Sequence, residues 1–311
     1  MSLIEKALQK IQAAAPPSAQ SIGLKDHVFP DAELVQGENH DYNSHGSSVV
    51  LSFDKLPTLE IDKSVLRKYG MLAQQEQERV LVRQFREIKR SLLSLLTESG
   101  EIQEAGEQRV IMLSSALSGD GKTFTALNLA SSLSMERGFN VILVDGDVAK
   151  PHISSLLDCS DKLGLIDFIA DSSVSINKIL YKTNIPGLYF VPAGKKSEQA
   201  NELMSGQRMK DVLSQLSGIS KNTLLLFDTS PILLTSESKV MASYADFVIL
   251  MVRSGVTPKL AVSDSIRALQ EIGVRFGVVL NDTKSNVFTS YGYGYGYGYG
   301  YGDSYGSGIK Q

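Results

Sequence analysis

Residues 110–129 read VIMLSSALSGDGKTFTALNL, and the prediction of the fold starts from these residues. The short apolar run at 110–113 has the composition of a buried β-strand, and an amphipathic helix is expected over about residues 122–137. The loop between them has a small residue, four spacers and then Gly-Lys-Thr, which is a phosphate-binding pattern. A strand, a small-residue loop and a helix in this order predict a nucleotide-binding site rather than an accidental glycine turn.

Each residue type in this loop has a chemical reason. Gly119 and Gly121 let backbone N–H groups face phosphate oxygens, and the helix N-terminus adds partial positive charge. Lys122 can reach the β- and γ-phosphates, and the Thr123 hydroxyl can bind Mg²⁺. The first position is Ala116, which is small enough for the turn. We therefore expect ATP and Mg²⁺ as cofactors, with the nucleotide held by Ser118, Gly119, Asp120, Gly121, Lys122, Thr123, Phe124 and Asn281.

Composition limits the possible classes of protein. The chain has 311 residues, of which 42% are hydrophobic, so it can bury a core of one large domain or about two smaller ones. A net charge of −3 argues against a general nucleic-acid binder. The single cysteine, Cys159, excludes a disulfide within the chain and fits a reducing cytoplasm. We expect no membrane span and no signal peptide, so that any membrane association would come through a partner.

Hydrophobic patterning after residue 108 alternates between strand-like and helix-like segments. Strands are expected at 110–114, 140–145, 188–192, 223–228, 247–252 and 276–281. Helices are expected at 122–137, 153–157, 166–170, 207–217, 236–243 and 259–272. This order predicts an α/β, P-loop NTPase-like fold with a doubly wound, mostly parallel sheet and helices on both faces. Ligands of such folds bind at the carboxyl ends of the strands.

Three parts are expected along the chain. Residues 1–62 form an N-terminal helix, at about 1–12, and a proline-containing linker with a short strand at 48–53. That helix either docks on the domain or binds a partner. Residues 63–285 form the nucleotide-binding domain, with a short helix near its start at 61–69 and a charged helix at 74–96. Residues 286–311 alternate tyrosine with glycine and are expected to form a disordered tail.

Two further apolar segments end in aspartate. Asp145 and Asp147 follow the strand expected at 140–145, and Asp228 ends the strand at 223–228. A buried acid at a strand end is costly unless it meets a cation or a donor. We therefore predict that Thr123, Asp145 and Asp228 hold Mg²⁺, and that Lys122, Asp145 and Asp147 are catalytic. Two other roles are possible for Asp145 and Asp147. They could cap a helix, or they could form the D-x-D motif of metal-dependent glycosyltransferases.

Three motifs and the tail together resemble the bacterial tyrosine autokinases of polysaccharide export, the BY-kinases of the CpsD/CapB family. The motifs lie at residues 116–123, 141–151 and 224–231. The opening MSLIEKAL, the FREIKR at 85–90 and the DGDVAKP at 145–151 look like the exosortase-associated subgroup of exopolysaccharide biosynthesis. The similarity covers roughly residues 74–282 and the tail.

This resemblance implies a role for each site residue. Lys122 and Thr123 would bind phosphate and Mg²⁺, Asp145 and Asp147 would bind metal and activate a tyrosine hydroxyl, and Asp228 would complete the metal site. The phosphorylated residues would be the tail tyrosines, namely Tyr291, Tyr293, Tyr295, Tyr297, Tyr299, Tyr301 and Tyr305.

The same resemblance implies partners and a location. A membrane chain-length-determinant protein, which is a polysaccharide co-polymerase, would activate the kinase. Self-association and a tyrosine phosphatase are implied as well. The protein would be cytoplasmic, recruited by its partner to the inner face of the plasma membrane.

The sequence departs from the family pattern at three places. Ala149 replaces the arginine of D-x-D-x-R, and Ser230 stands within Thr229-Ser230-Pro231 where T-P-P is common. The oligomerisation motif E-x-x-R-x-x-R becomes R-x-x-R-x-x-K at residues 83–89, which puts a ring-shaped oligomer in doubt.

Two other functions therefore stay open. One is a nucleotide-switched ATPase of the partition or septum-positioning type, although Leu117 stands where those proteins carry a signature lysine. The other is an inactive regulator that binds ATP without turning it over. Release of phosphate without phosphotyrosine would identify the first, and binding without turnover the second.

Overall fold

The computed structural model describes residues 56–72, 78–98, 109–220 and 222–283. The helix expected at 1–12, the strand expected at 48–53 and the tail at 286–311 lie outside these residues. Among the helices of the described part, none is long and apolar enough to cross a membrane.

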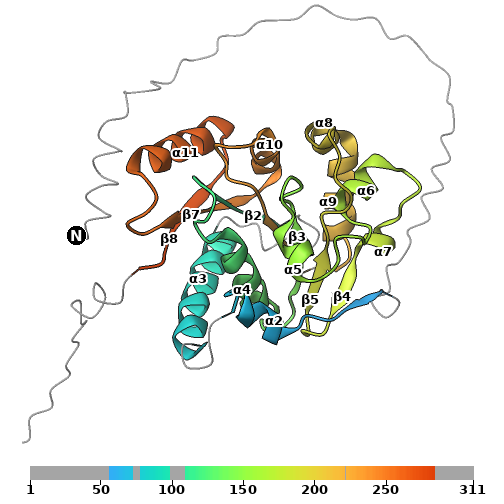
Figure 1. Ribbon diagram of the computed structural model, residues 1–311, viewed down its shortest axis with the longest axis horizontal. Helices are drawn as coiled ribbons and strands as arrows, with labels where there is room; N and C mark the ends of the chain where they lie inside the picture. Colours follow the sequence, from blue (N-terminus) through green and yellow to red (C-terminus); the bar gives the residue numbers. More distant parts are fainter. Residues whose placement is uncertain (1–55, 73–77, 99–108, 221, 284–311) are drawn as a thin grey trace, which may run out of the picture. The chain divides into compact units, whose positions relative to one another are not determined.

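One eight-stranded sheet forms the centre of the described domain (Figure 1). Its strand order is β1-β4-β5-β3-β6-β2-β7-β8, and the neighbours are parallel except for the antiparallel β4 and β5. The predicted α/β fold with a mostly parallel sheet is confirmed. The strands are β1 (Thr58–Leu59), β2 (Val110–Ser115), β3 (Asn140–Asp145), β4 (Tyr181–Thr183), β5 (Leu188–Val191), β6 (Thr223–Asp228), β7 (Phe247–Arg253) and β8 (Phe276–Asn281).

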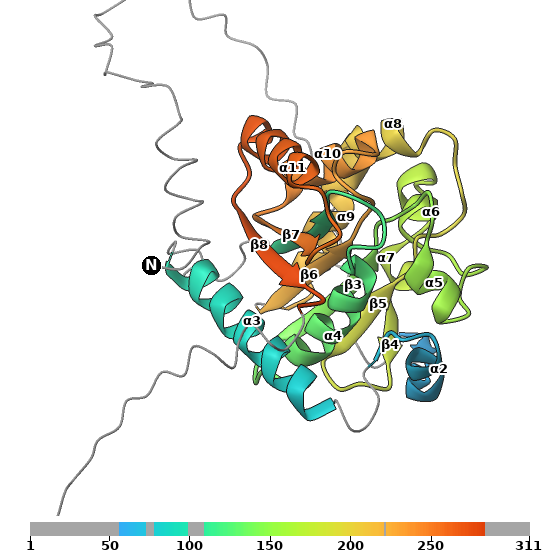
Figure 2. The same ribbon diagram turned by 60° about the vertical axis from the view of Figure 1, so that its left-hand side comes forward.

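Helices cover both faces of this sheet (Figures 1 and 2). On one side lie α3 and α4, and on the other side lie α9, α10 and α11. The helices are α2 (Lys63–Lys68), α3 (Glu78–Glu98), α4 (Lys122–Ser134), α5 (His152–Leu156), α6 (Leu165–Ala170), α7 (Ile176–Ile179), α8 (Ala200–Ser205), α9 (Gln207–Ser217), α10 (Ser236–Tyr244) and α11 (Lys259–Ile272).

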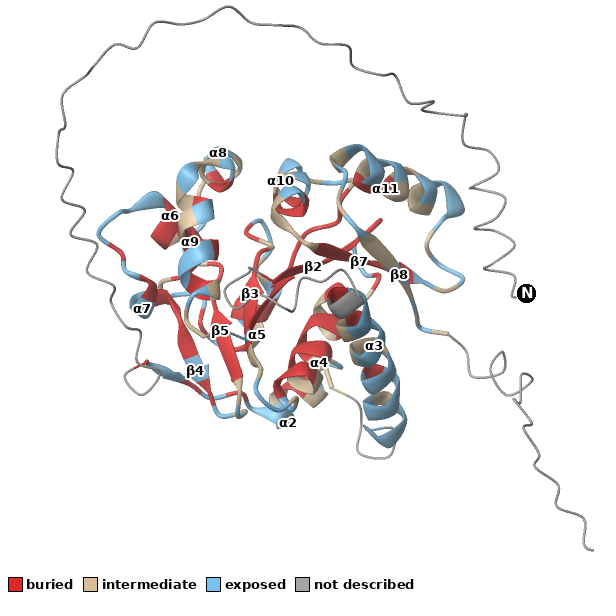
Figure 3. Cartoon of the chain, turned by 180° about the vertical axis from the view of Figure 1, so that it is seen from behind, coloured by how far each residue is buried: buried red, intermediate tan, exposed pale blue. Residues whose placement is uncertain are grey.

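The central strands are apolar because both of their faces are covered. Every residue of β2 and β6 is buried, and Figure 3 shows β2 in red. Successive side chains point to opposite faces. Val110 and Met112 therefore pack in the cluster that contains α9, α10 and α11, whereas Ile111 and Leu113 pack against α3 and α4.

Several elements differ from the sequence-based expectation. The helix expected to reach residue 137 ends at Ser134, and Gly138 then turns the chain with a φ of +85°. The elements β1, β4, α7 and α8 were not predicted, because none of them is long enough to show a hydrophobic period. Strand β1 pairs with β4 and so joins the sheet ahead of residue 63, where the domain was expected to begin.

Parallel pairing brings the predicted site segments to one edge of the sheet. Asp145 at the end of β3 is the register partner of Asp228 at the end of β6. Asp228 is also the register partner of Leu113 in β2, just ahead of the phosphate-binding loop. Two buried acids and this loop are therefore neighbours, although more than a hundred residues separate Asp228 from Leu113 along the chain.

Candidate active site

The loop after β2 leads directly into α4 in a conformation that only glycine adopts easily. Gly119 and Gly121 have φ values of +86° and +98°. Gly121 is the residue that precedes α4, and no side chain caps the helix there. The first N–H groups of a helix have no partner within the helix, so this uncapped start can bind an anion.

Asp120 holds the loop by contacts to three parts of the fold. Its carboxylate accepts hydrogen bonds from the Leu117 amide at 3.1 Å and the Thr257 hydroxyl at 2.7 Å. Its carbonyl oxygen accepts one from the Asn281 side-chain amide at 3.0 Å. The buried Asp120 side chain and the Asn281 amide therefore stabilise the loop itself. Of the other residues expected to hold nucleotide, Phe124 packs its ring against Phe85, with the ring centroids 6.1 Å apart.

Alanine at Gly121 is expected to weaken ATP binding far more than alanine at Gly119. Both positions have a positive φ, which costs an alanine about 1–2 kcal/mol. A Cβ at Gly119 meets nothing within 4 Å, whereas one at Gly121 collides with the Asn281 side-chain amide. We expect a larger loss of affinity for Gly121→Ala, measured with a fluorescent ATP analogue, because the Asn281 amide must move away from the Asp120 carbonyl oxygen that it binds. Equal losses in the two variants would contradict this account of the loop.

The two strand-end acids each keep one oxygen without a partner. Asp145 Oδ2 accepts hydrogen bonds from the Ser154 amide and hydroxyl, each at 2.7 Å. Asp228 Oδ2 accepts one from the Thr123 hydroxyl, also at 2.7 Å. The Oδ1 atoms of Asp145 and Asp228 are buried and have no hydrogen-bond partner. Such unsatisfied oxygens are typical of a site that an ion completes.

Burial shifts the pKa values of the charged groups at this edge of the sheet. Burial raises the pKa of Asp145 to about 6, and burial together with the Asp145 charge raises the pKa of Asp228 to about 8. Burial also lowers the pKa of Lys122, against the opposing effect of Asp228 and Asp147. The Lys122 ammonium donates to the Ser115 hydroxyl at 3.0 Å. A bound divalent cation would reverse the shifts of the two acids.

This donor set fits magnesium when phosphates complete it. Within residues 56–72, 78–98, 109–220 and 222–283, no group of three or more His, Cys, Asp and Glu side chains could hold a metal alone. Mg²⁺ in proteins commonly uses one or two carboxylates together with substrate phosphates and water. The unpaired Oδ1 atoms of the register partners Asp145 and Asp228, together with the Thr123 hydroxyl that contacts Asp228, satisfy that requirement.

A cleft of about 850 Å³ opens beside the loop and Asp147. That volume lies within the range of small-molecule sites. Predicted site residues that line it are Ser118, Gly119, Lys122, Thr123 and Asp147. Basic residues that were not singled out line it too, namely Lys150, His152, Lys195 and Lys196. The predicted site residues that do not line it are Asp120, Gly121, Phe124, Asp145, Asp228 and Asn281.

Two serines that contact the acids were not foreseen from the sequence. Ser154 binds Asp145, and the Ser230 hydroxyl donates to Asp147 Oδ1 at 2.7 Å. From the sequence, Ser230 is only a departure from the T-P-P form of the motif. Neither serine lies at a sequence spacing that identifies it, because Ser154 reaches Asp145 from helix α5 and Ser230 reaches Asp147 from the loop after β6.

Comparison with known proteins now identifies the domain. Residues 108–276 match the family model described as AAA domain. The chain belongs to this family. A Ralstonia solanacearum relative called EpsB is 30% identical over 193 residues, which are 62% of this chain and 25% of the relative. The tyrosine-protein kinase YwqD of Bacillus subtilis is 27% identical over 188 residues, which are 60% of this chain and 78% of that kinase.

Solved structures agree with these sequence matches. The kinase domain of the Escherichia coli tyrosine kinase ETK aligns with a TM-score of 0.56 at 26% identity, over 67% of this chain and 80% of that one. The VpsO kinase domain aligns with the same score at 27% identity, over 68% of this chain and all of that one. The homologues are tyrosine-protein kinases, and an AAA domain with this loop implies ATP binding. The chain spans about a quarter to a third of the EpsB relatives' length.

Proposed function

We propose that this chain is an ATP- and Mg²⁺-dependent protein-tyrosine autokinase. It phosphorylates its own C-terminal tyrosine cluster and so regulates exopolysaccharide synthesis and export. The observation that carries the proposal is the convergence of Lys122, Thr123 and the three acids at one edge of the sheet. Kinase homologues and the alternating tyrosines of residues 291–301 support the choice of acceptor.

Each residue of the site has a proposed task. The uncapped start of α4 and Lys122 bind the ATP phosphates. Thr123, Asp145 and Asp228 hold Mg²⁺, and that ion neutralises phosphate charge when it is bound. Asp147 lies on the cleft wall, where its carboxylate accepts the proton of a tyrosine hydroxyl. The tyrosine oxygen then bonds to the γ-phosphorus, the bond from that phosphorus to the bridging oxygen breaks, and ADP leaves.

The acceptor tyrosines are within reach of this cleft along the chain. Strand β8 ends at Asn281, whose amide binds the carbonyl oxygen of Asp120 in the phosphate loop. The last described residues of the chain, up to 283, therefore lie beside the nucleotide edge of the sheet. A glycine-rich segment of fifteen residues spans roughly 20 Å. Residues 291–305 can thus meet their own cleft or that of a second copy, although they lie outside the described residues.

The first partner we propose is a membrane chain-length-determinant protein that activates the kinase. A tyrosine phosphatase reverses the modification. The kinase itself is cytoplasmic, and its activator recruits it to the inner face of the plasma membrane. These proposals rest on the likeness to the tyrosine autokinases and to tyrosine-protein kinases such as CpsD of Streptococcus agalactiae, which is 27% identical over 191 residues.

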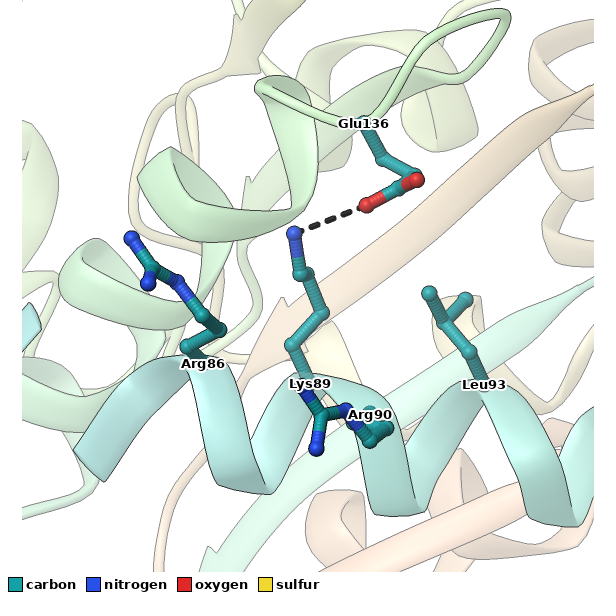
Figure 4. Close-up of a pocket in the computed structure, with 5 residues that line it drawn as sticks. All are labelled: Arg86, Lys89, Arg90, Leu93 and Glu136. Carbon is teal, nitrogen blue, oxygen red and sulfur yellow. Dashed lines mark hydrogen bonds and ion pairs between the residues drawn. The ribbon is translucent and has the colours of Figure 1, made fainter. Parts of the chain in front are cut away.

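Self-association would use a surface of α3 that differs from the family motif. Lys89, the last basic residue of that motif, forms an ion pair with Glu136 in the turn that follows α4, with Nζ and Oε2 2.8 Å apart (Figure 4). Arg86 and Arg90 line a shallow cavity of about 340 Å³ around this pair. Lys89 is therefore engaged within its own subunit. We expect any contact between copies to depend on the arginines of α3 instead.

Mass spectrometry of the tail tests the proposed activity. The full chain is incubated with Mg²⁺ and ATP, and the peptides of residues 286–311 are then analysed. We expect phosphate on several of the seven tyrosines between residues 291 and 305. Released phosphate without phosphotyrosine would contradict the proposal in favour of a switched ATPase. Bound ATP with no turnover would contradict it in favour of an inactive regulator.

A further inference from the structure

Ser230 lies in the loop that follows β6, two residues after Asp228. Only 5% of the residue is exposed. Its hydroxyl donates a hydrogen bond to Asp147 Oδ1 at 2.7 Å, across a separation of 83 residues in the chain. A proline at this position, as in the T-P-P form of the motif, would offer no such donor.

The backbone of Ser230 is held in place by neighbouring hydroxyls. Its carbonyl oxygen accepts hydrogen bonds from Ser114 Oγ at 3.0 Å and Ser238 Oγ at 2.8 Å. The preceding residue, Thr229, donates from both its amide and its hydroxyl to the Leu113 carbonyl. These bonds tie the loop to β2 and α10. The Ser230 hydroxyl therefore acts from a fixed point, and little entropy is lost when it binds Asp147.

Asp147 has weaker support from its own loop. It is only partly buried, and its Oδ1 accepts a second hydrogen bond from the Lys150 amide at 3.1 Å in an exposed turn. The bonds from Ser230 and Lys150 both go to Asp147 Oδ1. Oδ2 therefore stays available to accept a proton. Without the Ser230 hydroxyl, only the exposed turn would restrain this side chain.

We infer that Ser230 is a positioning residue that holds the Asp147 carboxylate in the orientation that accepts the tyrosine proton. The inference rests on the proposed kinase activity. The backbone contacts of Ser230 use its carbonyl oxygen, whereas the contact with Asp147 uses its hydroxyl. Replacing the hydroxyl alone therefore leaves the loop anchored and removes only the restraint on Asp147.

The experiment compares Ser230→Ala with Ser230→Thr in the full chain. For alanine we expect kcat of tail phosphorylation to fall about 10- to 100-fold, because small misplacements of a reacting group cost this much. The KM for ATP, the affinity for a fluorescent ATP analogue and the melting temperature should stay unchanged. Threonine keeps the hydroxyl and should restore most of kcat. Ser236→Ala, at the exposed start of α10, is the matched control and should behave as wild type.

A double-mutant cycle with Asp147→Asn separates this inference from the proposed function. If Ser230 acts through Asp147, adding Ser230→Ala to Asp147→Asn causes no further loss. Full activity of Ser230→Ala beside an inactive Asp147→Asn would overturn the inference and leave the kinase proposal standing. Equal losses in kcat and in ATP affinity would also overturn it. A wild-type chain that forms no phosphotyrosine would instead end the kinase proposal itself.

Discussion

Replacing Lys122 by alanine is expected to abolish phosphorylation of the tail, with a loss of at least about 10³-fold. The Lys122 side chain is 8% exposed and lies at the first position of α4, beside the uncapped helix start. It is the lysine of the phosphate-binding loop, so its removal takes away the cation that would meet the transferred phosphate. The rate is measured as phosphotyrosine formed per minute at saturating Mg²⁺ and ATP.

The control for this variant is Lys239→Ala, which removes an exposed lysine from α10. It should phosphorylate the tail at the wild-type rate. Circular dichroism and melting of both variants show whether the fold is retained. Phosphotyrosine at a normal rate in Lys122→Ala would disprove the assignment of this loop as the catalytic phosphate site.

Replacing Asp228 by asparagine is expected to abolish transfer and to stabilise the nucleotide-free protein. Asp228 is 1% exposed, and its register partner in β3 is a second buried acid, Asp145. Asparagine keeps a side-chain oxygen for the Thr123 hydroxyl but removes a negative charge that Mg²⁺ would need. The free energy of unfolding should therefore rise by about 1 kcal/mol or more near pH 8, while phosphotyrosine formation is lost.

The effect of Asp228 on stability has a defined pH dependence. Its pKa is raised from 3.8 to about 8, so between these values the folded protein binds more protons than the unfolded chain. The free energy of unfolding then falls as pH rises, by about 1 kcal/mol per unit for this group. Asp145, with a pKa of about 6, adds to the slope only below that pH. Between pH 6 and 8 the slope therefore belongs mainly to Asp228.

Urea unfolding without nucleotide at pH 6, 7 and 8 measures this slope. We expect a falling free energy in the wild type and a shallower dependence in Asp228→Asn. Glu271→Gln, at an exposed position of α11, is the matched control and should keep the wild-type slope. An unchanged slope in Asp228→Asn would show that this carboxyl is not the buried group that titrates.

Elements with a clear hydrophobic signal were predicted closely from the sequence. The predicted bounds of β6 and β8 are those of the structure, because each is a strand-length apolar segment that ends in a polar residue. Helix α11 was predicted to the residue, since Gly273 ends it in the left-handed conformation. Strand β4 has three residues, and its antiparallel pairing with β5 depends on contacts that no local pattern specifies.

In the candidate site, too, a local sequence pattern predicts some features and tertiary packing determines the others. The acids could be predicted because each follows a buried run, and parallel pairing of β3 and β6 then brings Asp145 and Asp228 together. The environment of each acid could not be predicted. Ser154 in α5 and Ser230 in the loop after β6 reach their carboxylates only through tertiary packing. For the same reason the sequence did not show that Asn281 binds the loop backbone.

A crystal structure with Mn²⁺ and a non-hydrolysable ATP analogue tests the central claim most directly, because the anomalous signal of manganese locates the ion. We expect a triphosphate along residues 116–123 and a metal ion bound by the Thr123 hydroxyl and an Asp228 oxygen. A nucleotide bound away from Lys122, or a metal ion that contacts neither Thr123 nor Asp228, would contradict it.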